Sequence, residues 1–208
     1  MAAKFLPYEA NLRLQGFKLI AGIDEAGRGP LAGPVVSAAV ILKDKAKLPG
    51  LDDSKKLTAK KREYLFEQIL DNVVDYAIAV VPAEIIDKYN ILNATLMAND
   101  LCVQTLAVKP DFILIDGRDK QILDLPFMTV IKGDSLIESV AAASILAKVT
   151  RDAIMRHYAK EFPLFGFDMH MGYGTRVHVS NIREHGYCEI HRKSFLLKAE
   201  QLELFENF

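Results

Sequence analysis

The sequence is organised around the stretch Gly22-Ile23-Asp24-Glu25-Ala26-Gly27-Arg28-Gly29-Pro30. A short apolar and β-branched run over residues 17–23 leads into it, and such a run predicts a buried strand. This strand ends at two adjacent carboxylates, and a loop follows in which two glycines flank an arginine. Because an unpaired carboxylate is very costly to bury, the two acids must reach solvent or bind a cation.

The composition is that of a globular chain. It has 208 residues and is 50% hydrophobic, so it can bury a sizeable core. Cys102 and Cys188 lie far apart and match no metal-binding spacing, which favours reduced thiols inside a cell. The sequence shows neither the apolar core of a signal peptide nor a run long enough to span a membrane. We therefore expect a cytoplasmic protein that makes no contact with a membrane.

The net charge of -1 conceals an uneven distribution. Residues 43–62 carry eight Lys or Arg against three Asp, and residues 148–198 carry nine against five acids. Two basic segments beside an acidic cluster suit a polyanion that needs metal ions at its reactive point. The alternative is that each basic run is only the solvated face of a helix.

Periodicity and turn residues predict one α/β domain over residues 1–208. The first two strands are joined by a short connection, which predicts an antiparallel pair. Strands followed by helical crossovers predict a mixed central sheet flanked by helices. The expected strands are 17–24, 35–42, 73–81, 111–115 and 127–131, and the expected helices are 59–70 after a Thr58 cap, 82–89, 93–108, 134–160, 176–185 and 195–206.

Four acids are predicted to gather at one edge of this sheet. Asp24 and Glu25 end the first strand, Asp116 ends the fourth, and Asp134 begins the longest helix. Ligands of open α/β sheets bind outside the carboxyl ends of strands. Four carboxylates there would repel one another unless cations lie among them, and oxygen ligands suit Mg²⁺ or Mn²⁺. Taken singly, Asp134 could only cap its helix, and Asp116 could only form a turn with Gly117.

Asp24 and Glu25 cannot both direct their side chains at one metal ion from a regular strand, because adjacent residues point to opposite faces. Either the chain bends, or Glu25 contributes its backbone carbonyl. The sequence leaves both arrangements open.

The opening stretch, extended to Val35, resembles the signature of the bacterial ribonuclease HII family. The related ribonuclease HIII typically has Thr where this chain has Arg28, and it carries an added N-terminal domain. The resemblance implies a ribonuclease H-like fold with a helical C-terminal part. The blocks that carry it occur in order, at residues 24–35, 53–57, 115–117, 132–134, 141–149, 151–152, 172–175 and 191–195.

The same resemblance implies an endonuclease that hydrolyses the RNA strand of RNA–DNA hybrids and cuts on the 5′ side of ribonucleotides embedded in duplex DNA. Asp24, Glu25, Asp116 and Asp134 would be its catalytic and metal-binding acids. Two ions, Mg²⁺ or Mn²⁺, would activate a water and stabilise the leaving 3′-oxygen, which leaves 3′-hydroxyl and 5′-phosphate ends.

Further residues are candidates for binding the substrate. Residues 27–29, the glycine loop, would contact the ribonucleotide at the junction, since glycines let backbone groups reach a 2′-hydroxyl. Tyr173 would lie against the sugar of the following deoxynucleotide, and residues 54–56 would contact a phosphate. The full set implied by the resemblance is Gly27, Arg28, Gly29, Ser54, Lys55, Lys56, Lys148, Tyr173, Arg192 and Ser194.

Other charged residues are expected away from the metal chemistry. Lys148 lies roughly 21 Å from Asp134 along the predicted helix, at 1.5 Å per residue. We expect Lys148 and Arg151 to hold the flanking strand of the nucleic acid. The histidines, among them His178 and His191, lack the spacing of a metal site and are expected in loops or at the surface.

Two other functions fit parts of the sequence. Residues 27–32 formally match the dinucleotide fingerprint of a nicotinamide-dependent oxidoreductase, but an apolar strand is predicted after them instead of a helix. A non-catalytic module that binds RNA–DNA hybrids would share the basic segments but would not need four acids.

We expect a monomer. The apolar and aromatic residues 201–208 would dock a sliding clamp or pack as a terminal helix.

Overall fold

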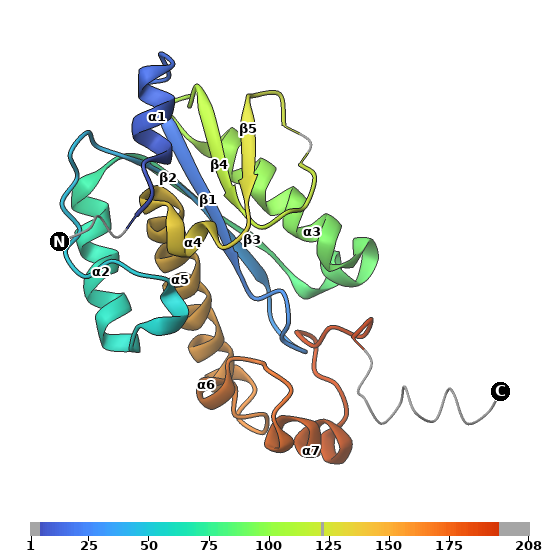
Figure 1. Cartoon of the computed structure of the whole chain (residues 1–208). Coiled ribbons are helices and arrows are strands. Elements are labelled where there is room, and N and C mark those ends of the chain that lie inside the picture. Colours follow the sequence, from blue (N-terminus) through green and yellow to red (C-terminus); the bar gives the residue numbers. More distant parts are fainter. Residues whose placement is uncertain (1–4, 122, 196–208) are drawn as a thin grey trace.

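The computed structural model describes residues 5–121 and 123–195, and it contains one five-stranded sheet (Figure 1). The strand order is β3-β2-β1-β4-β5. β1 pairs with β2 in antiparallel and with β4 in parallel orientation, which confirms the predicted mixed sheet and its opening antiparallel pair. The strands are β1 (Ile20–Ala26), β2 (Val35–Leu42), β3 (Val73–Val81), β4 (Phe112–Asp116) and β5 (Phe127–Val130).

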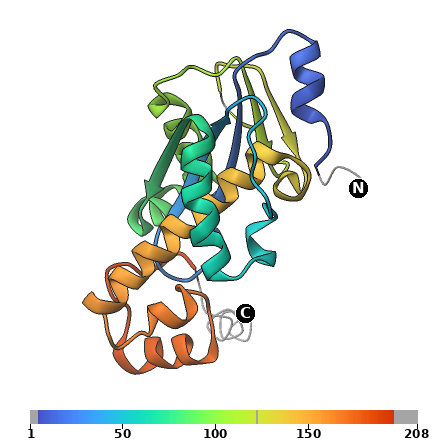
Figure 2. The same cartoon turned by 90° about the vertical axis from the view of Figure 1, so that its left-hand side faces the viewer.

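Helices cover both faces of the sheet. α3 (Ala83–Thr105) packs on one face, and α2 (Ala59–Asn72) and α5 (Glu138–Glu161) pack on the other, where they lie in front of the sheet in Figure 2. The side chain of Thr58 accepts a hydrogen bond from the Lys61 amide, which confirms the predicted cap. None of the helices in the described part of the chain has the length and apolar character needed to span a membrane.

α5 approaches β1 closely. Residues 141–143 are fully buried alanines in the core between α5 and the sheet. A methyl group added to Gly22 on β1 would overlap the backbone of Ser139 and Val140. This contact fixes the helix directly beneath the strand that carries the two adjacent acids.

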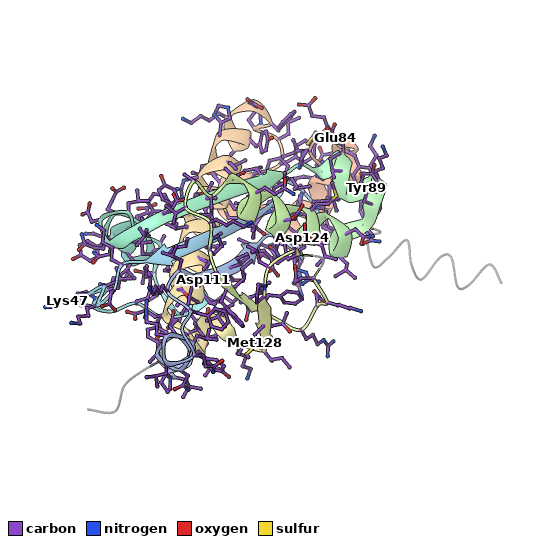
Figure 3. The ribbon with its side chains drawn as sticks, turned by 90° about the horizontal axis from the view of Figure 1, so that it is seen from above. Lys47, Glu84, Tyr89, Asp111, Asp124 and Met128 are labelled. Carbon is purple, nitrogen blue, oxygen red and sulfur yellow. The ribbon has the colours of Figure 1, made fainter. Side chains whose placement is uncertain are left out.

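The start of β4 is tied to the start of β1. The Asp111 carboxylate, which is labelled in Figure 3, accepts hydrogen bonds from the amides of Lys18 at 2.7 Å and Leu19 at 3.0 Å. Ile23 then lies opposite Ile115 in the parallel pair. The next residue on each strand is an aspartate, so the register brings the two acids to the same level.

The predicted helix 134–160 is wrong at its start. A short α4 (Gly133–Leu136) ends at Ile137, which is extended with φ -128° and ψ 129°, and α5 begins after it. Ile137 is fully buried in a cluster with Leu114 and Val140. Packing of this side chain against β4 therefore interrupts a segment whose local sequence favours a continuous helix.

The expected helices 82–89 and 93–108 are confirmed as the two helical segments of α3, which are separated by a kink where Asn90 adopts the non-helical φ 66° and ψ 166°. α1 (Tyr8–Leu14) was not predicted, and it is held by the buried side chain of Leu12.

The C-terminal part is helical and packs on the far end of α5 (Figure 1). α6 (Phe167–His170) and α7 (Arg176–His185) form a separate core with Ala32 and Met155, and the bounds of α7 are close to those predicted. The expected helix 195–206 lies outside the described residues except for its first residue. A 3₁₀ turn, η1 (Ser54–Lys56), precedes α2.

Candidate metal-binding and nucleic-acid site

Three carboxylates from separate segments converge at one end of the sheet. Asp24 lies on β1, Asp116 ends the neighbouring β4, and Asp134 lies in α4. One oxygen of each lies within 4.8 Å of the others. Asp24 and Asp134 are 3% and 4% exposed, and Asp116 is half-buried. The structure thus brings together three of the four acids singled out in the sequence.

This cluster concentrates negative charge in a buried place. Burial raises the pKa of Asp24 well above its usual value, and the nearby Glu25 and Asp116 carboxylates raise it further. Burial and then Asp134 also raise the pKa of Asp116. The Gly133 amide donates a hydrogen bond to Asp116 Oδ1 at 2.7 Å. An all-oxygen donor set with mutual repulsion fits hard divalent cations such as Mg²⁺ or Mn²⁺.

Glu25 is not part of the three-oxygen group. It follows Asp24 on β1, and its carboxylate lies 3.4 Å from the Arg28 guanidinium. Burial raises the pKa of Glu25, whereas Arg28 lowers it. The Glu25 side chain therefore faces the glycine loop, whereas the Asp24 side chain faces Asp116 and Asp134. Adjacent residues on a strand point to opposite faces, so this arrangement is expected.

Two hollows flank the acids and share two basic residues. The larger one, here called the acidic cleft, has a volume of about 850 Å³ and includes Asp116, Asp134 and Lys56. The smaller one, the glycine-loop pocket, has a volume of about 240 Å³. Arg28 and Lys55 line both. The glycine-loop pocket is further lined by Glu25, Ala26, Gly27, Gly29, Ser54, Ser144, Lys148 and Tyr173.

The glycine loop and Tyr173 face each other. A methyl group at Gly29 would lie 4.0 Å from Cε1 of Tyr173, whose side chain is substantially exposed. Gly27 has φ +97°, and a methyl group there would overlap the Arg151 side chain. Glycine is required at residue 27 by its backbone conformation and by the close approach of Arg151.

Lys148 faces the glycine-loop pocket, although it was predicted to lie far from the acids along one helix. The break at Ile137 removes the basis of that distance, because Asp134 does not lie on α5. Lys148 Nζ also binds Asp152 Oδ1 at 2.7 Å. Ser54, in turn, is buried with its Oγ 2.8 Å from Ser144 Oγ.

Arg192 is fully buried and cannot contact a substrate directly, contrary to prediction. Its guanidinium donates hydrogen bonds to the carbonyls of Gly27 at 2.6 Å, Arg28 at 3.0 Å and Gly33 at 2.9 Å. Burial lowers the pKa of Arg192 to about 9, and the nearby Arg151 adds to the effect. Arg192 therefore supports the glycine loop from behind.

Arg151 has a similar place, so the prediction that it holds a flanking strand is wrong. It is fully buried and donates hydrogen bonds to the carbonyls of Ala32, Pro34 and Met171 at 3.0 to 3.1 Å. Two buried arginines thus organise the connection between β1 and β2. In the sequence, a positively charged residue is compatible both with phosphate binding and with this structural role, so the two could not be distinguished from charge alone.

Ser194 does not line either hollow. Its hydroxyl donates a hydrogen bond to Asp87 on α3 at 2.6 Å, and the amides of Lys193 and Ser194 bind the same carboxylate at 2.9 Å. These contacts fix the last described residues to α3.

His178 and His191 are buried, with 0% and 1% exposure, so the prediction that they lie in loops or at the surface is wrong. Their rings form part of an aromatic cluster with Phe165 and Phe167. The spacing of the histidines along the chain does not predict this burial.

Sequence reasoning missed several residues that line the acidic cleft. Arg118 and Lys132 both do so. Asp119 also lines it and accepts a hydrogen bond from Arg28 Nη1 at 2.7 Å. The only available signal was their position directly after Asp116 or before Asp134. Ser144, which was not singled out, was detectable as a polar residue inside an alanine-rich segment.

The dinucleotide-binding alternative fails on the geometry of the glycine loop. Residues 27–32 lead into β2, an antiparallel strand, and not into a helix whose N-terminus could receive a pyrophosphate. This confirms the apolar strand predicted after the glycine loop, since the residues of β2 are buried along its whole length.

Comparisons with known proteins agree with one another. A family model described as Ribonuclease HII matches residues 21–198. The Ribonuclease HII of Chlorobaculum parvum is 53% identical over 184 residues, which cover 86% of this chain and 90% of the relative. The crystal structure of ribonuclease H2 from Pyrococcus horikoshii has a TM-score of 0.76 at 27% identity, and the match covers 92% of this chain and 100% of that one. A PCNA:RNase HII complex from Archaeoglobus fulgidus has a TM-score of 0.73 at 27% identity, covering 86% and 96%.

Proposed function

The chain belongs to the ribonuclease HII family and is a metal-dependent endoribonuclease, and from this premise we propose that it cuts on the 5′ side of ribonucleotides embedded in duplex DNA. The family acts on the RNA strand of RNA–DNA hybrids. The observation that carries the finer proposal is the placing of the three-carboxylate cluster beside two hollows that share Arg28 and Lys55. One hollow would hold the reacting phosphate, and the other would test the sugar beside it.

We assign the divalent cations to Asp24, Asp116 and Asp134, whose oxygens already lie close together. Glu25 would complete the set through its carboxylate or its backbone carbonyl. When bound, two Mg²⁺ or Mn²⁺ ions would supply an activated water and stabilise the charge that develops on the leaving 3′-oxygen. Because these three oxygens already lie within 4.8 Å of one another, the ions would meet a largely preorganised set of ligands.

The basic residues would hold the substrate on either side of the acids. Lys55 Nζ lies 3.4 Å from Asp134, so it would stand next to a phosphate held by the metal ions. Lys56 and Arg28 extend this positive edge into the acidic cleft, and Lys148 extends it into the glycine-loop pocket. Backbone groups of the glycine loop would meet the 2′-hydroxyl, which distinguishes RNA from DNA.

Tyr173 would test the sugar on the 3′ side of the ribonucleotide. A metal cluster recognises a phosphate and cannot by itself distinguish ribose from deoxyribose. The Tyr173 ring lies against the glycine loop and is exposed enough to meet a substrate. We expect Tyr173→Ala to lose much of the rate and much of the preference for an RNA-to-DNA junction. Comparing a duplex that has a single ribonucleotide with a continuous RNA–DNA hybrid measures both.

The proposal is tested with a duplex that contains one embedded ribonucleotide. We expect cleavage on its 5′ side with Mg²⁺ and none in EDTA, and end-labelling should show 3′-hydroxyl and 5′-phosphate ends. Asp116→Asn is the matched inactive control. A non-catalytic module would bind the duplex in both conditions without cutting it. Cleavage only within longer RNA stretches would contradict the proposed reading of single ribonucleotides.

The relative from Archaeoglobus fulgidus was solved as a complex with PCNA. We propose that residues 201–208, which lie outside the described residues, dock a sliding clamp of this kind. Their apolar and aromatic side chains are the support for the proposal. Removing residues 201–208 should abolish clamp binding in a pull-down and leave cleavage of a short duplex intact.

A further inference from the structure

A buried series of hydrogen bonds runs through two histidines to the loop that carries Tyr173. The Cys188 amide lies 2.9 Å from Nδ1 of His191. Nε2 of His191 lies 3.1 Å from Nε2 of His178, and Nδ1 of His178 lies 2.9 Å from the Tyr173 carbonyl. Both rings are fully buried. None of these contacts belongs to the acids or to the basic residues of the two hollows.

The partners at the two ends fix the direction of every hydrogen bond. A backbone amide can only donate, so Nδ1 of His191 accepts and its proton lies on Nε2. The Cys188 thiol, whose Sγ lies 3.0 Å from the same nitrogen, then acts as a second donor to it. The His191 Nε2–H then donates to Nε2 of His178. The remaining proton of His178 lies on Nδ1 and donates to the Tyr173 carbonyl. This arrangement requires both rings to be neutral, because a second proton would place two N–H groups face to face.

The same histidines are tied to the glycine loop. His191 pairs with Ala32 across a β-bridge and is followed by Arg192, whose guanidinium binds the carbonyls of residues 27 and 28. The Leu31 amide binds the Gly172 carbonyl at 2.8 Å, next to Tyr173. The loop that would contact the ribose and the loop that would contact the next sugar are therefore joined through one buried network.

We propose that His178 and His191 are positioning residues that hold Tyr173 opposite the glycine loop and thereby set the preference for an RNA-to-DNA junction. The inference rests on the proposed function, since it assigns Tyr173 to the deoxy sugar. The tyrosine ring is exposed, so its place depends on the backbone beneath it. Fixing the Tyr173 carbonyl from the buried side removes freedom that the ring would otherwise lose on binding.

The rival explanation is that the two histidines only pack the C-terminal core. His178→Phe keeps the ring and its aromatic contacts but removes both hydrogen bonds. His178→Asn places an amide N–H near the position of Nδ1 and so retains the donor to Tyr173. We expect His178→Phe to lower the ratio of kcat/KM on a single-ribonucleotide duplex to that on a continuous hybrid by about tenfold, the size of one hydrogen bond. His178→Asn should recover most of this ratio.

The outcomes separate the two proposals. Equal losses on both substrates by His178→Phe would show a packing role only and would overturn the inference, whereas Tyr173→Ala would still change the ratio. An unchanged ratio in Tyr173→Ala would overturn the proposed role of Tyr173 and this inference with it.

A second measurement needs no substitution. Imidazole ¹⁵N shifts of the intact protein at pH 7 should show the Nε2–H tautomer for His191 and the Nδ1–H tautomer for His178. The opposite tautomers, or a protonated ring, would overturn the proposed relay, that is, the series of hydrogen bonds from Cys188 through His191 and His178 to Tyr173. This test stands even if His178→Phe fails to fold.

Discussion

Asp116 destabilises the metal-free fold. One of its oxygens lies within 4.8 Å of oxygens of Asp24 and Asp134, and burial together with Asp134 raises its pKa, which the hydrogen bond from the Gly133 amide lowers only in part. A carboxyl group whose pKa is raised in the folded state destabilises that state above the raised pKa, where it is ionised. At pH 7 the three carboxylates therefore lower the free energy of unfolding of the metal-free protein. The same three carboxylates are the ones that we assign to cation binding.

Replacing Asp116 with Asn should therefore separate activity from stability. We expect cleavage to fall by about 10²-fold or more, because several kcal/mol of charge stabilisation are lost with the ligand and each 1.36 kcal/mol is a factor of ten. In EDTA the variant should melt at a higher temperature than the wild type. Asp124→Asn, at the exposed residue labelled in Figure 3, is the matched control for loss of one charge. Near wild-type turnover of Asp116→Asn in saturating Mg²⁺ would contradict the assigned metal site.

At the level of elements, the strands could be predicted because their apolar and β-branched residues are local signals. The position of Asp116 at a strand end followed from the same pattern. The break at Ile137 could not be predicted, because it depends on a contact with β4 and on the bond from the Gly133 amide to Asp116. The burial of Arg192 depends likewise on carbonyls more than 150 residues away in the sequence.

The lysines of the turn η1 are predicted to contribute to the salt dependence of substrate binding. Lys55 and Lys56 are exposed on this short element at the edge of the acidic cleft. Replacing both with Ala should weaken binding and reduce the slope of log K against log salt by about 0.9 for each lost phosphate contact, as for a B-form duplex. Fluorescence anisotropy over a salt series in Ca²⁺ or EDTA measures this slope without cleavage.

The control for the turn is a second pair of lysines with the same charge. Lys45 and Lys47 are exposed and line neither hollow, and Figure 3 labels Lys47 at one end of the molecule. Their double Ala variant should leave the salt slope of binding nearly as in the wild type. An equal change in both double variants would indicate a general charge effect and would assign η1 to the solvated surface.

At the scale of the whole molecule, the acids at the end of the sheet and the histidines of the C-terminal core make the stability depend on pH in opposite directions. The acids at the end of the sheet have raised pKa values in the folded protein, so their contribution to stability improves as pH falls. The C-terminal core contains His191, whose pKa burial lowers to about 4, with smaller contributions from His178 and His170. A buried neutral histidine binds its proton less readily than the unfolded chain does, so its contribution worsens as pH falls from about 6.5 to about 4.

The comparison of wild type with His191→Phe isolates the second effect, because the acids are common to both. The unfolded histidine takes up a proton between pH 7 and pH 5, whereas the folded one does not until pH approaches 4. The wild type should therefore lose about 2 kcal/mol of unfolding free energy relative to His191→Phe over this interval. Urea unfolding in EDTA at both pH values measures the difference, and His157→Gln, at an exposed position on α5, is the control. A difference that stays constant from pH 7 to pH 5 would mean that His191 titrates alike in both states, and the neutral relay from Cys188 to Tyr173 would then be excluded.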